Sequence, residues 1–343
     1  MRKTPTPRTG SRPRSNPRPN SRSNTRSNSR TMPTRRRIPT RRRRRRTRRS
    51  GRGFFLAALA ILIFAIIYIF AGDRIFPPIT TFFITDGEEI IVSFLDVGQG
   101  DSVVVRSAGN TVLIDGGEHG ARGVVISYLN EAGITRLCYV VATHPHSDHI
   151  GGLVQILRDF EIGSVIKPDI SHEAQYTQVY GNFLEAIHNN AVHVIHPSPG
   201  DRLQAGIIHL EVISPPATMR SINDQSIVLR LEHGQTSFLF TGDAESPAER
   251  WMVDSRANIS SDVLHVGHHG SRTSTTESFL LAVAPEIAVI SVGENNRHGH
   301  PHQEVTDSLR SHGIEILRTD ELGTIRMLTD GNEITRKENT PQD

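Results

Sequence analysis

The 343-residue sequence contains one cysteine, Cys138. A single cysteine excludes an intrachain disulfide and a metal cluster held by thiolates. It lies in the apolar run from Leu137 to Ala142, where we expect a buried strand, so we interpret it as a small buried hydrophobic residue. A Gly-x-Ser-x-Gly nucleophile elbow is also absent. The sequence therefore offers no competing serine or cysteine nucleophile.

Acidic residues are absent from residues 1–52, which contain 21 lysines and arginines among proline, serine, threonine and asparagine. Such a segment buries too little apolar surface to offset the entropy of ordering, so we expect a disordered tail. The whole chain has a formal net charge of +3, but from Gly53 onward 18 basic residues stand against 36 acidic ones, a net charge of −18. The expected folded part thus lacks the basic surface of a strong polyanion binder.

Charge and proline are missing from the eighteen residues Phe54 to Ala71. This length is at the short end of a membrane span, and the run lacks the polar face of a core helix. We predict a transmembrane helix at 53–72 and a linker at 73–87. Arginines, including the run from Arg41 to Arg46, precede the helix, so the positive-inside rule predicts a single-pass cell-membrane protein with a cytoplasmic N-terminus and an extracytoplasmic remainder. A cleaved signal peptide is the alternative.

The arginine-rich tail lies beside this expected membrane span, so lipid head groups are candidate partners of the tail. Anionic lipid head groups attract basic residues near a membrane surface with about 1 kcal/mol each. We therefore expect the tail to bind these head groups, and nucleic-acid binding is the alternative.

From about Glu88 the sequence alternates short strand-like runs with fewer helical stretches. Sheet packed on sheet, with helices over the outer faces, buries such runs best. We expect one domain at 88–336 and a loose C-terminus at 337–343. The expected strands are Ile90–Leu95, Ser102–Ser107, Thr111–Ile114, Cys138–Thr143, Val165–Lys167, Val192–Ile195, Ile207–Ile213, Ser226–Leu231, Ser237–Thr241, Asp262–Val266, Ile287–Val292 and Thr324–Leu328, and the main helices are Val124–Ala132, Gly151–Asp159, Tyr180–Asn189, Ala248–Asp254, Glu277–Val283 and Glu304–His312.

Four potential metal ligands follow the expected strand Cys138–Thr143 within six residues: His144, His146, Asp148 and His149. Imidazole and carboxylate are ligands that zinc accepts at about 2.0–2.2 Å. His144 and His146 can bind one ion while Asp148 and His149 turn toward a second. A polar surface loop rich in histidine is the alternative, which the specific spacing and the downstream candidates disfavour.

Further candidate ligands follow other expected strands. Asp243 comes after Gly242 at the end of a buried strand, where a carboxylate can bridge two cations. His268 and His269 follow another strand; one can complete the second metal's ligands and the other can meet substrate or donate a proton. Arg297, His300 and His302 offer donors suited to a phosphoryl group or another oxyanion.

Two metals about 3.5–4 Å apart lower the pKa of a shared water and stabilise negative charge on the attacked centre. The reaction class is therefore metal-assisted hydrolysis, with Asp148 binding metal or orienting the attacking hydroxide. Histidine and carboxylate ligands fit two divalent ions, and zinc is the metal we expect. A site with few histidines also accepts manganese, which is the alternative.

Seven motifs occur in an order that resembles the metallo-β-lactamase superfamily, and specifically the hydrolase-like domain of ComEC-type DNA-uptake competence proteins. The resemblance covers roughly Ile90 to Leu328. It implies an α/β fold, a four-layer αββα sandwich with the metal site along one edge of the two sheets. The motifs are Phe94 to Ser102, Leu113 to Gly117, His144 to Gly152, Asn223 to Ser226, Thr241 to Glu245, Gly267 to Ser271 and Gly299 to His302.

Matched residue by residue, the resemblance implies first-metal ligands His144 and His146, second-metal ligands Asp148 and His149, and Asp243 as the bridging carboxylate. Where many members of the superfamily place another first-metal histidine, this chain has the motif that begins at Asn223, and we assign Asn223 to substrate binding.

Similarity to the secreted choline-phosphate esterases of the superfamily favours His269 as a metal ligand and His268 as a catalytic residue on the substrate side. Asp101 and Asp115 are expected near the site, as turn residues or as partners of the ligands.

The resemblance implies a phosphodiesterase or nuclease that acts on extracytoplasmic DNA or nucleotides. A phosphocholine or other phosphoester esterase on envelope polymers is the second hydrolase hypothesis. The third is a metal-stabilised binding module without catalysis, which the complete set of candidate ligands disfavours. Fold analogy alone does not choose between these substrates.

Overall fold

A computed structural model of the chain describes residues 89–170, 177–216 and 218–337. The expected tail at 1–52, membrane span at 53–72 and linker at 73–87 lie outside the described residues, as do residues 338–343. Among the helices that the structure describes, none is long and apolar enough to cross a membrane.

The first sheet has eight strands in the order β15-β14-β1-β2-β3-β4-β5-β6. The pairs from β15 to β3 are antiparallel and those from β3 to β6 are parallel. Its strands are β1 (Ile90–Phe94), β2 (Val103–Ser107), β3 (Asn110–Ile114), β4 (Arg136–Val141), β5 (Glu161–Ile166), β6 (His193–Ile195), β14 (Ile325–Thr329) and β15 (Ile334–Lys337).

The second sheet has seven strands in the order β13-β12-β11-β10-β9-β8-β7. The pairs from β13 to β10 are parallel and those from β10 to β7 are antiparallel. Its strands are β7 (Arg202–Ala205), β8 (Ile208–Ser214), β9 (Val228–His233), β10 (Thr236–Phe240), β11 (Val263–His265), β12 (Ile287–Ile290) and β13 (Glu315–Arg318).

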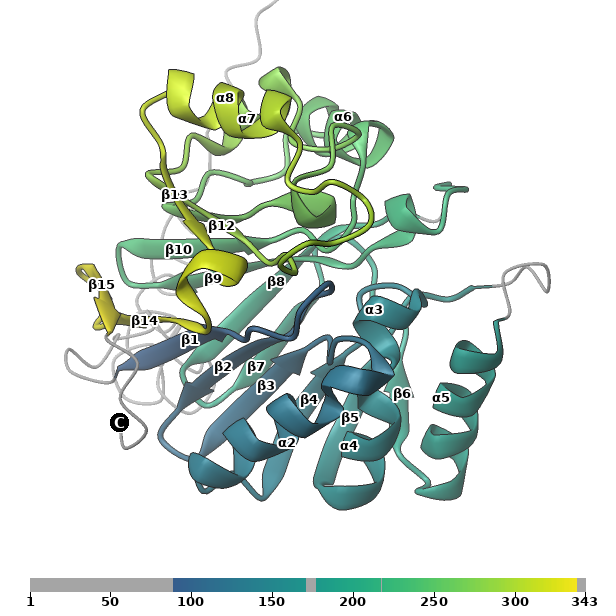
Figure 1. Cartoon of the computed structure of the whole chain (residues 1–343). Helices are drawn as coiled ribbons and strands as arrows, with labels where there is room; N and C mark the ends of the chain where they lie inside the picture. The colour runs from purple at the N-terminus through teal and green to yellow at the C-terminus, as the bar shows by residue number, and fades with distance from the viewer. Residues whose placement is uncertain (1–88, 171–176, 217, 338–343) are drawn as a thin grey trace, which may run out of the picture. The chain divides into compact units, whose positions relative to one another are not determined.

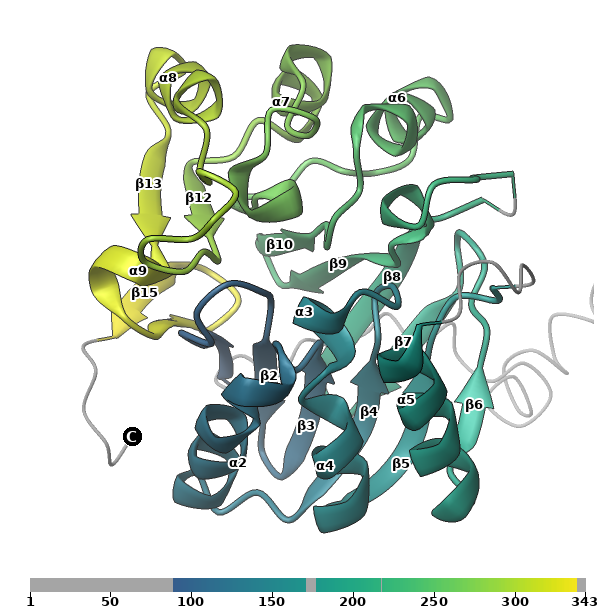
Figure 2. The same ribbon diagram turned by 45° about the vertical axis from the view of Figure 1, so that its right-hand side comes forward.

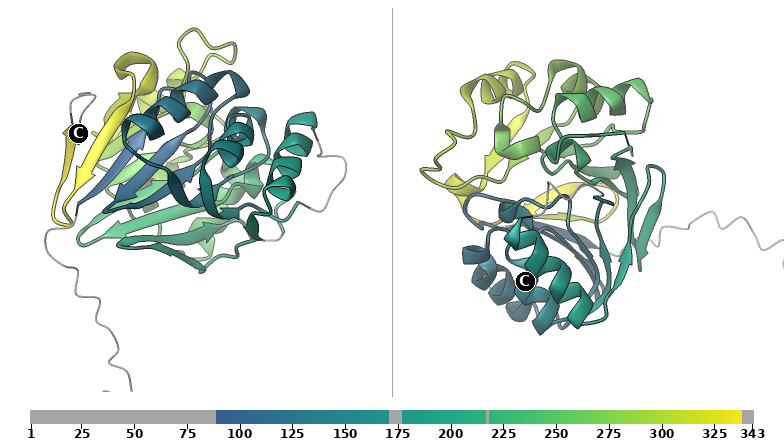
Figure 3. Two further views of the ribbon diagram at one scale, coloured as in Figure 1. Left: turned by 90° about the horizontal axis from the view of Figure 1, so that it is seen from below. Right: turned by 90° about the vertical axis from the view of Figure 1, so that its right-hand side faces the viewer.

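Helices cover the outer face of each sheet, which makes four layers (Figures 1 and 2). The helices α2 (Arg122–Glu131), α4 (Leu153–Asp159) and α5 (Gln178–Asn189) pack on the first sheet, and α6 (Ser246–Asp254), α7 (Glu277–Val283) and α8 (Gln303–Ser311) pack on the second. Figure 3 shows the same layers from two further sides. The arrangement is an αββα sandwich with two mixed sheets, which is the fold that the sequence motifs led us to expect.

The layers explain why several strands are apolar at every position. In β10, Phe238 and Phe240 belong to the core between the sheets, while Leu239 belongs to the core beneath α6, α7 and α8. Successive side chains of a strand point to opposite faces. Because both faces of this strand are covered, both sets are apolar and buried.

Three strands at or next to sheet edges, β7, β13 and β15, have no counterpart among the expected strands. Each of these strands has only four residues, and some of them are polar, such as the exposed Arg202 and Gln204 of β7. A run this short and polar carries little periodic signal. Cys138, which we expected to be buried in β4, is only half-buried, and its sulfur lies 3.6 Å from the side-chain oxygen of Asn110.

Candidate metal centre

The candidate ligands lie where strands of both sheets end. Asp115 follows β3, and His144 to His149 follow β4 and run into the short helix α3 (Ser147–Ile150). Asp243 follows β10, and His268 and His269 follow β11 in the tight turn η4 (Gly267–Gly270). The carboxyl ends of parallel strands are where α/β sheets bind ligands. In Figures 1 and 2, α3 lies at the edge where the two helix-covered sheets meet.

The segment after β4 turns two imidazoles toward one point. His144 Nε2 and His146 Nδ1 lie 2.9 Å apart. The other ring nitrogen of His144, Nδ1, lies 3.2 Å from Thr143 Oγ1 and 3.3 Å from Ser226 Oγ. His144 is therefore held from behind, and its Nε2 is left to face the centre.

Asp243 lies between two groups of imidazoles. Its Oδ2 is 3.4 Å from His144 Nε2, and its Oδ1 is 3.2 Å from His149 Nε2. The preceding Gly242 has a φ of +51°, and a side chain there would crowd Thr143 and Ser226. The left-handed glycine thus lets the carboxylate reach across the edge of the sheet, where each oxygen can face a different cation.

His269 faces the second group of ligands. Its Nε2 lies 3.4 Å from Asp148 Oδ2 and 3.6 Å from Asp243 Oδ1. Its Nδ1 lies 3.0 Å from the carbonyl oxygen of Ser291 and 3.2 Å from Asp101 Oδ1, so this nitrogen carries the proton and Nε2 is left for a metal.

Asp115 holds the second group from behind. It is fully buried, and its Oδ2 lies 2.8 Å from His149 Nδ1. It also accepts hydrogen bonds from the backbone N–H of Thr143 (2.8 Å) and from Thr143 Oγ1 (2.6 Å). Asp101 and Asp115, expected near the site, therefore contact the rings of the candidate ligands His269 and His149.

Three buried atoms of the centre have no hydrogen-bond partner: His149 Nε2, Asp243 Oδ1 and His269 Nε2. Buried polar atoms are almost always paired. Four groups of potential ligand atoms also lie close together, with the members of each group within 4.8 Å of one another: His144, His149 and Asp243; Asp148, His149 and His269; Asp101, Asp243 and His269; and Asp101, Asp115 and His149. Unpaired nitrogen and carboxylate atoms that converge in this way fit divalent cations.

The electrostatics of the centre also favour a cation. Burial lowers the pKa of His269, but the carboxylates of Asp243 and Asp101 outweigh burial and raise this pKa to about 10. Burial also lowers the pKa of His149, but the carboxylates of Asp243 and Asp115 outweigh burial and raise this pKa well above its ordinary value. The same imidazoles hold the pKa of Asp243 well below its ordinary value against the effect of burial. The buried carboxylates thus favour positive charge at this place.

The remaining predicted site residues are dispersed around this centre. The ring of His300 lies 5.5 Å from that of His268 and 6.2 Å from that of His269, and the ring of His302 lies 4.9 Å from that of His300. Burial and the neighbouring imidazoles lower the pKa of His300 to about 4. Arg297 is exposed, and its Nε lies 3.2 Å from His298 Nε2. The structure therefore brings His300 beside the centre and leaves Arg297 on the surface loop.

Asn223 and His268 share a partner that sequence reasoning did not single out. Asn223 Nδ2 donates to Glu245 Oε1 (3.2 Å), and His268 Nδ1 lies 3.2 Å from the same oxygen. Glu245 stands two residues after Asp243 in the sequence, and this short separation from a candidate ligand could have indicated that it lies at the site. The sequence also did not indicate Ser226, whose hydroxyl accepts from the backbone N–H of Asp243 (3.1 Å).

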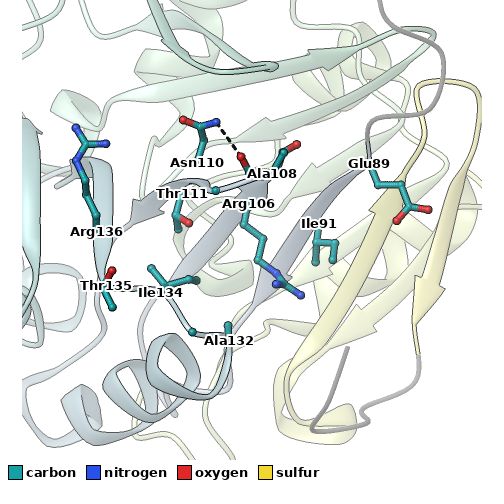
Figure 4. Close-up of a pocket in the computed structure, with 13 residues that line it drawn as sticks. Glu89, Ile91, Arg106, Ala108, Asn110, Thr111, Ala132, Ile134, Thr135 and Arg136 are labelled. Carbon is teal, nitrogen blue, oxygen red and sulfur yellow. Dashed lines mark hydrogen bonds between the residues drawn. The ribbon is translucent and has the colours of Figure 1, made fainter.

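A pocket of about 620 Å³ lies elsewhere, beside the β2–β3 turn and the loop between α2 and β4 (Figure 4). Its lining includes Arg106, Arg136 and Glu89, and it contains no histidine. This pocket therefore lacks the ligands of the metal centre.

Two mixed sheets face to face, helices on both outer faces, and histidines and carboxylates at the strand ends define the class of metallohydrolase-like αββα sandwiches. The chain belongs to the metallo-beta-lactamase superfamily, whose family model matches residues 95–294. This match confirms the superfamily that the sequence motifs indicated. The fold is generally hydrolytic and typically binds two metals.

Curated relatives agree with the more specific resemblance. The chain is 36% identical over 255 residues to ComE operon protein 3 of Bacillus subtilis, an alignment that covers 68% of this chain and 32% of that protein. It is 36% identical over 243 residues to Competence protein ComA of Neisseria gonorrhoeae, covering 69% and 32%. It is 31% identical over 242 residues to Recombination protein 2 of Haemophilus influenzae, covering 69% and 28%.

The chain thus spans about a third of the length of these relatives. The resemblance to ComEC-type competence proteins is confirmed for the hydrolase-like domain.

Proposed function

We propose that this chain is a metal-dependent hydrolase that acts as a phosphodiesterase or nuclease on DNA or nucleotides. The observation that carries the proposal is the position of Asp243, whose two carboxylate oxygens face different candidate ligands, His144 and His149. A bridging carboxylate of this kind serves two cations that act together on one phosphoryl group.

The chain's own residues divide into two sets. His144, His146 and Asp243 would hold the first cation, and Asp148, His149, His269 and Asp243 would hold the second. Two bound cations, zinc or manganese, would supply an acidic water and stabilise the charge that develops on phosphorus. Asp148 is less buried than His149 and His269, and this supports a role for it in orienting the attacking water.

Residues beside the metal centre would bind the phosphate group of the substrate. His300, His302 and Arg297 lie on the loop after β12, where imidazole and guanidinium groups can donate to phosphoryl oxygens. The relatives named for competence and recombination support DNA or nucleotides as the substrate class. The acidic composition from Gly53 onward favours a short or local contact with nucleic acid over a long binding groove.

We also propose that the chain is anchored in a membrane. The apolar run within 53–72 and the arginines before it support a single-pass protein with its N-terminus in the cytoplasm and its hydrolase domain outside. The basic tail would then contact anionic lipid head groups of the membrane.

The test is turnover by the full chain, purified in detergent, with bis-p-nitrophenyl phosphate, labelled single-stranded DNA and p-nitrophenyl phosphocholine. We expect activity on the first two that EDTA abolishes and zinc or manganese restores. Asp148→Ala should lower kcat/KM by about 100-fold or more, since one ligand supports several kcal/mol of transition-state stabilisation.

The matched control is Glu286→Ala, an exposed carboxylate at the end of the loop before β12, which should leave turnover unchanged. Turnover of the choline ester alone would replace the proposal with an envelope phosphoesterase. Two bound metals without turnover of any substrate would replace it with a binding module.

A further inference from the structure

The first metal site is short of one ligand by comparison with the second. The second group has three protein side chains besides Asp243, namely Asp148, His149 and His269. The first group has only His144 and His146 besides Asp243. Asn223 stands in the motif where a further histidine is common; it has no imidazole, and its amide N–H donates to Glu245. Another side chain must complete this site, or its cation is bound weakly.

His268 lies on the side of Asp243 that belongs to the first site. Its Nε2 is 3.7 Å from Asp243 Oδ2, the same oxygen that lies 3.4 Å from His144 Nε2. Two ligand atoms on one tetrahedral zinc, each bonded at about 2.0–2.2 Å, lie about 3.3–3.6 Å apart. The separation between His268 and Asp243 is therefore close to that of two ligands of one ion.

The other nitrogen of the His268 ring is already occupied. Nδ1 lies 3.2 Å from Glu245 Oε1 and 3.2 Å from Thr273 Oγ1. A metal-binding histidine typically donates its second ring N–H to a carboxylate, which orients the ring and leaves the other nitrogen for the metal. Asp115 does this for His149 in the same centre. Glu245 occupies the equivalent place behind His268, and Asn223 in turn holds Glu245.

The backbone also brings His268 to this position at a cost. His268 and His269 have φ values of 51° and 54°, so two consecutive non-glycine residues are left-handed. Such conformations cost about 1–2 kcal/mol each and persist where the surroundings enforce them, often at functional sites. The N–H of His268 donates to the carbonyl of Gly242 (3.0 Å), which ties the turn to the loop that carries Asp243. The turn thereby points adjacent imidazoles at opposite oxygens of one carboxylate.

We propose that His268, through Nε2, is the further protein ligand of the first metal, with Glu245 and Asn223 as its positioning residues. This assignment rests on the two-metal site of the proposed function. It replaces the substrate-side role that the sequence suggested for His268, and it leaves His300, whose ring lies 5.5 Å from that of His268, to meet substrate.

Metal stoichiometry of the full chain tests the assignment. The metal-free protein is titrated with zinc in competition with a chromophoric chelator, and bound zinc is counted by elemental analysis. The wild type should bind two zinc ions tightly. His268→Ala should still bind one zinc ion tightly and should bind the other more weakly. Loss of a residue that only positions a ligand lowers metal affinity by about 10–100-fold, and loss of the ligand itself should lower it further. Glu245→Gln keeps the imidazole and should weaken the same ion by about 10–100-fold.

His300→Ala is the matched control, because it removes a neighbouring imidazole whose ring lies 5.5 Å from that of His268. It should still bind two zinc ions with wild-type affinity. Circular dichroism and thermal unfolding of each metal-free variant separate loss of a ligand from loss of the fold. Equal binding of two ions by His268→Ala and the wild type would overturn the assignment.

A direct readout covers the case in which His268→Ala does not fold. Nitrogen NMR of histidine-labelled wild type should show that the Nε2 signal of His268 changes to that of a metal-bound nitrogen as zinc is added, and that Nδ1 keeps its proton. An Nε2 signal that zinc leaves unchanged would also overturn the assignment. Zinc binding at His268 without turnover would reject the proposed hydrolase while the ligand assignment stands.

Discussion

Asp115 shows how one buried residue governs the orientation of a ligand. Its carboxylate is fully buried and has three partners, the backbone and side chain of Thr143 and the ring of His149. Thr143 directly precedes His144, so this carboxylate connects both groups of ligands. A single carboxyl group therefore fixes the ring of His149 and the start of the segment that carries His144.

We predict that Asp115→Asn weakens binding of the second metal by about 10–100-fold, as is usual for partners behind a ligand. An amide that keeps its oxygen for His149 and Thr143 Oγ1 turns its N–H₂ group toward the backbone N–H of Thr143, so about 1–3 kcal/mol of stability should be lost as well. Zinc titration against a chelator and urea unfolding measure the two effects. Asp159→Asn, an exposed carboxylate at the end of α4, should change neither, and unaltered zinc binding by Asp115→Asn would contradict the prediction.

At the scale of elements, the centre depends on two loops from different parts of the first sheet. The loop after β1 contacts the segment of α3, where the N–H of Asp101 donates to the carbonyl of Asp148 (3.2 Å). Gly100 has a φ of +132°, and a β-carbon there would overlap with the carbonyl oxygen of Asp148. The close approach of these loops positions Asp101 and Asp148 on either side of His269.

We predict that Gly100→Ala separates these loops, destabilises the protein and weakens the second metal. The matched control is Gly109→Ala, in the β2–β3 turn, where φ is +80° but a β-carbon would meet nothing within 4 Å. Both variants place an alanine at a positive φ, which costs about 1 kcal/mol or more, and only Gly100→Ala adds the overlap with Asp148. Urea unfolding of the metal-free variants and zinc titration compare them; equal losses in both variants would show that the loop contact is unimportant.

At the scale of the whole molecule, opposite charges are segregated along the chain. Residues 1–52 contain 21 of the 39 basic residues, whereas the sequence from Gly53 onward has a net charge of −18. A protein that neutralises six to ten phosphates loses about 10³–10⁵ in affinity between 50 and 200 mM salt through release of counterions. From Gly53 onward there are 36 acidic residues against 18 basic ones, an excess that disfavours so many phosphate contacts.

We predict that a chain without residues 1–52 binds single-stranded DNA with a shallow salt dependence, less than about tenfold weaker at 200 mM than at 50 mM salt. Fluorescence anisotropy with labelled DNA measures this slope. The full chain provides the comparison, because a steeper slope would assign the excess contacts to the basic tail. A steep slope in the shortened chain would show that the hydrolase domain itself has a phosphate-binding surface.

Much of the centre was accessible from local patterns. The spacing from His144 to His149 after an apolar run places four candidate ligands at the end of one strand, because chain connectivity alone keeps them together. Buried runs such as Phe238 to Phe240 likewise predicted strands of a covered sheet, since apolar residues at every position require two covered faces. The short polar strands β7, β13 and β15 escaped this reasoning, because pairing with a neighbouring strand stabilises them and no local pattern records it.

The sequence by itself determined which residue types are available and which strand each one follows. Tertiary structure decided how they face one another. Whether His268 or His269 points to a given oxygen of Asp243 depends on two left-handed backbone angles, and the partner of Asn223 depends on a glutamate that the second sheet brings beside it. These orientations arise from contacts between segments distant in the chain, and a linear pattern of residues does not encode the angles that such contacts impose.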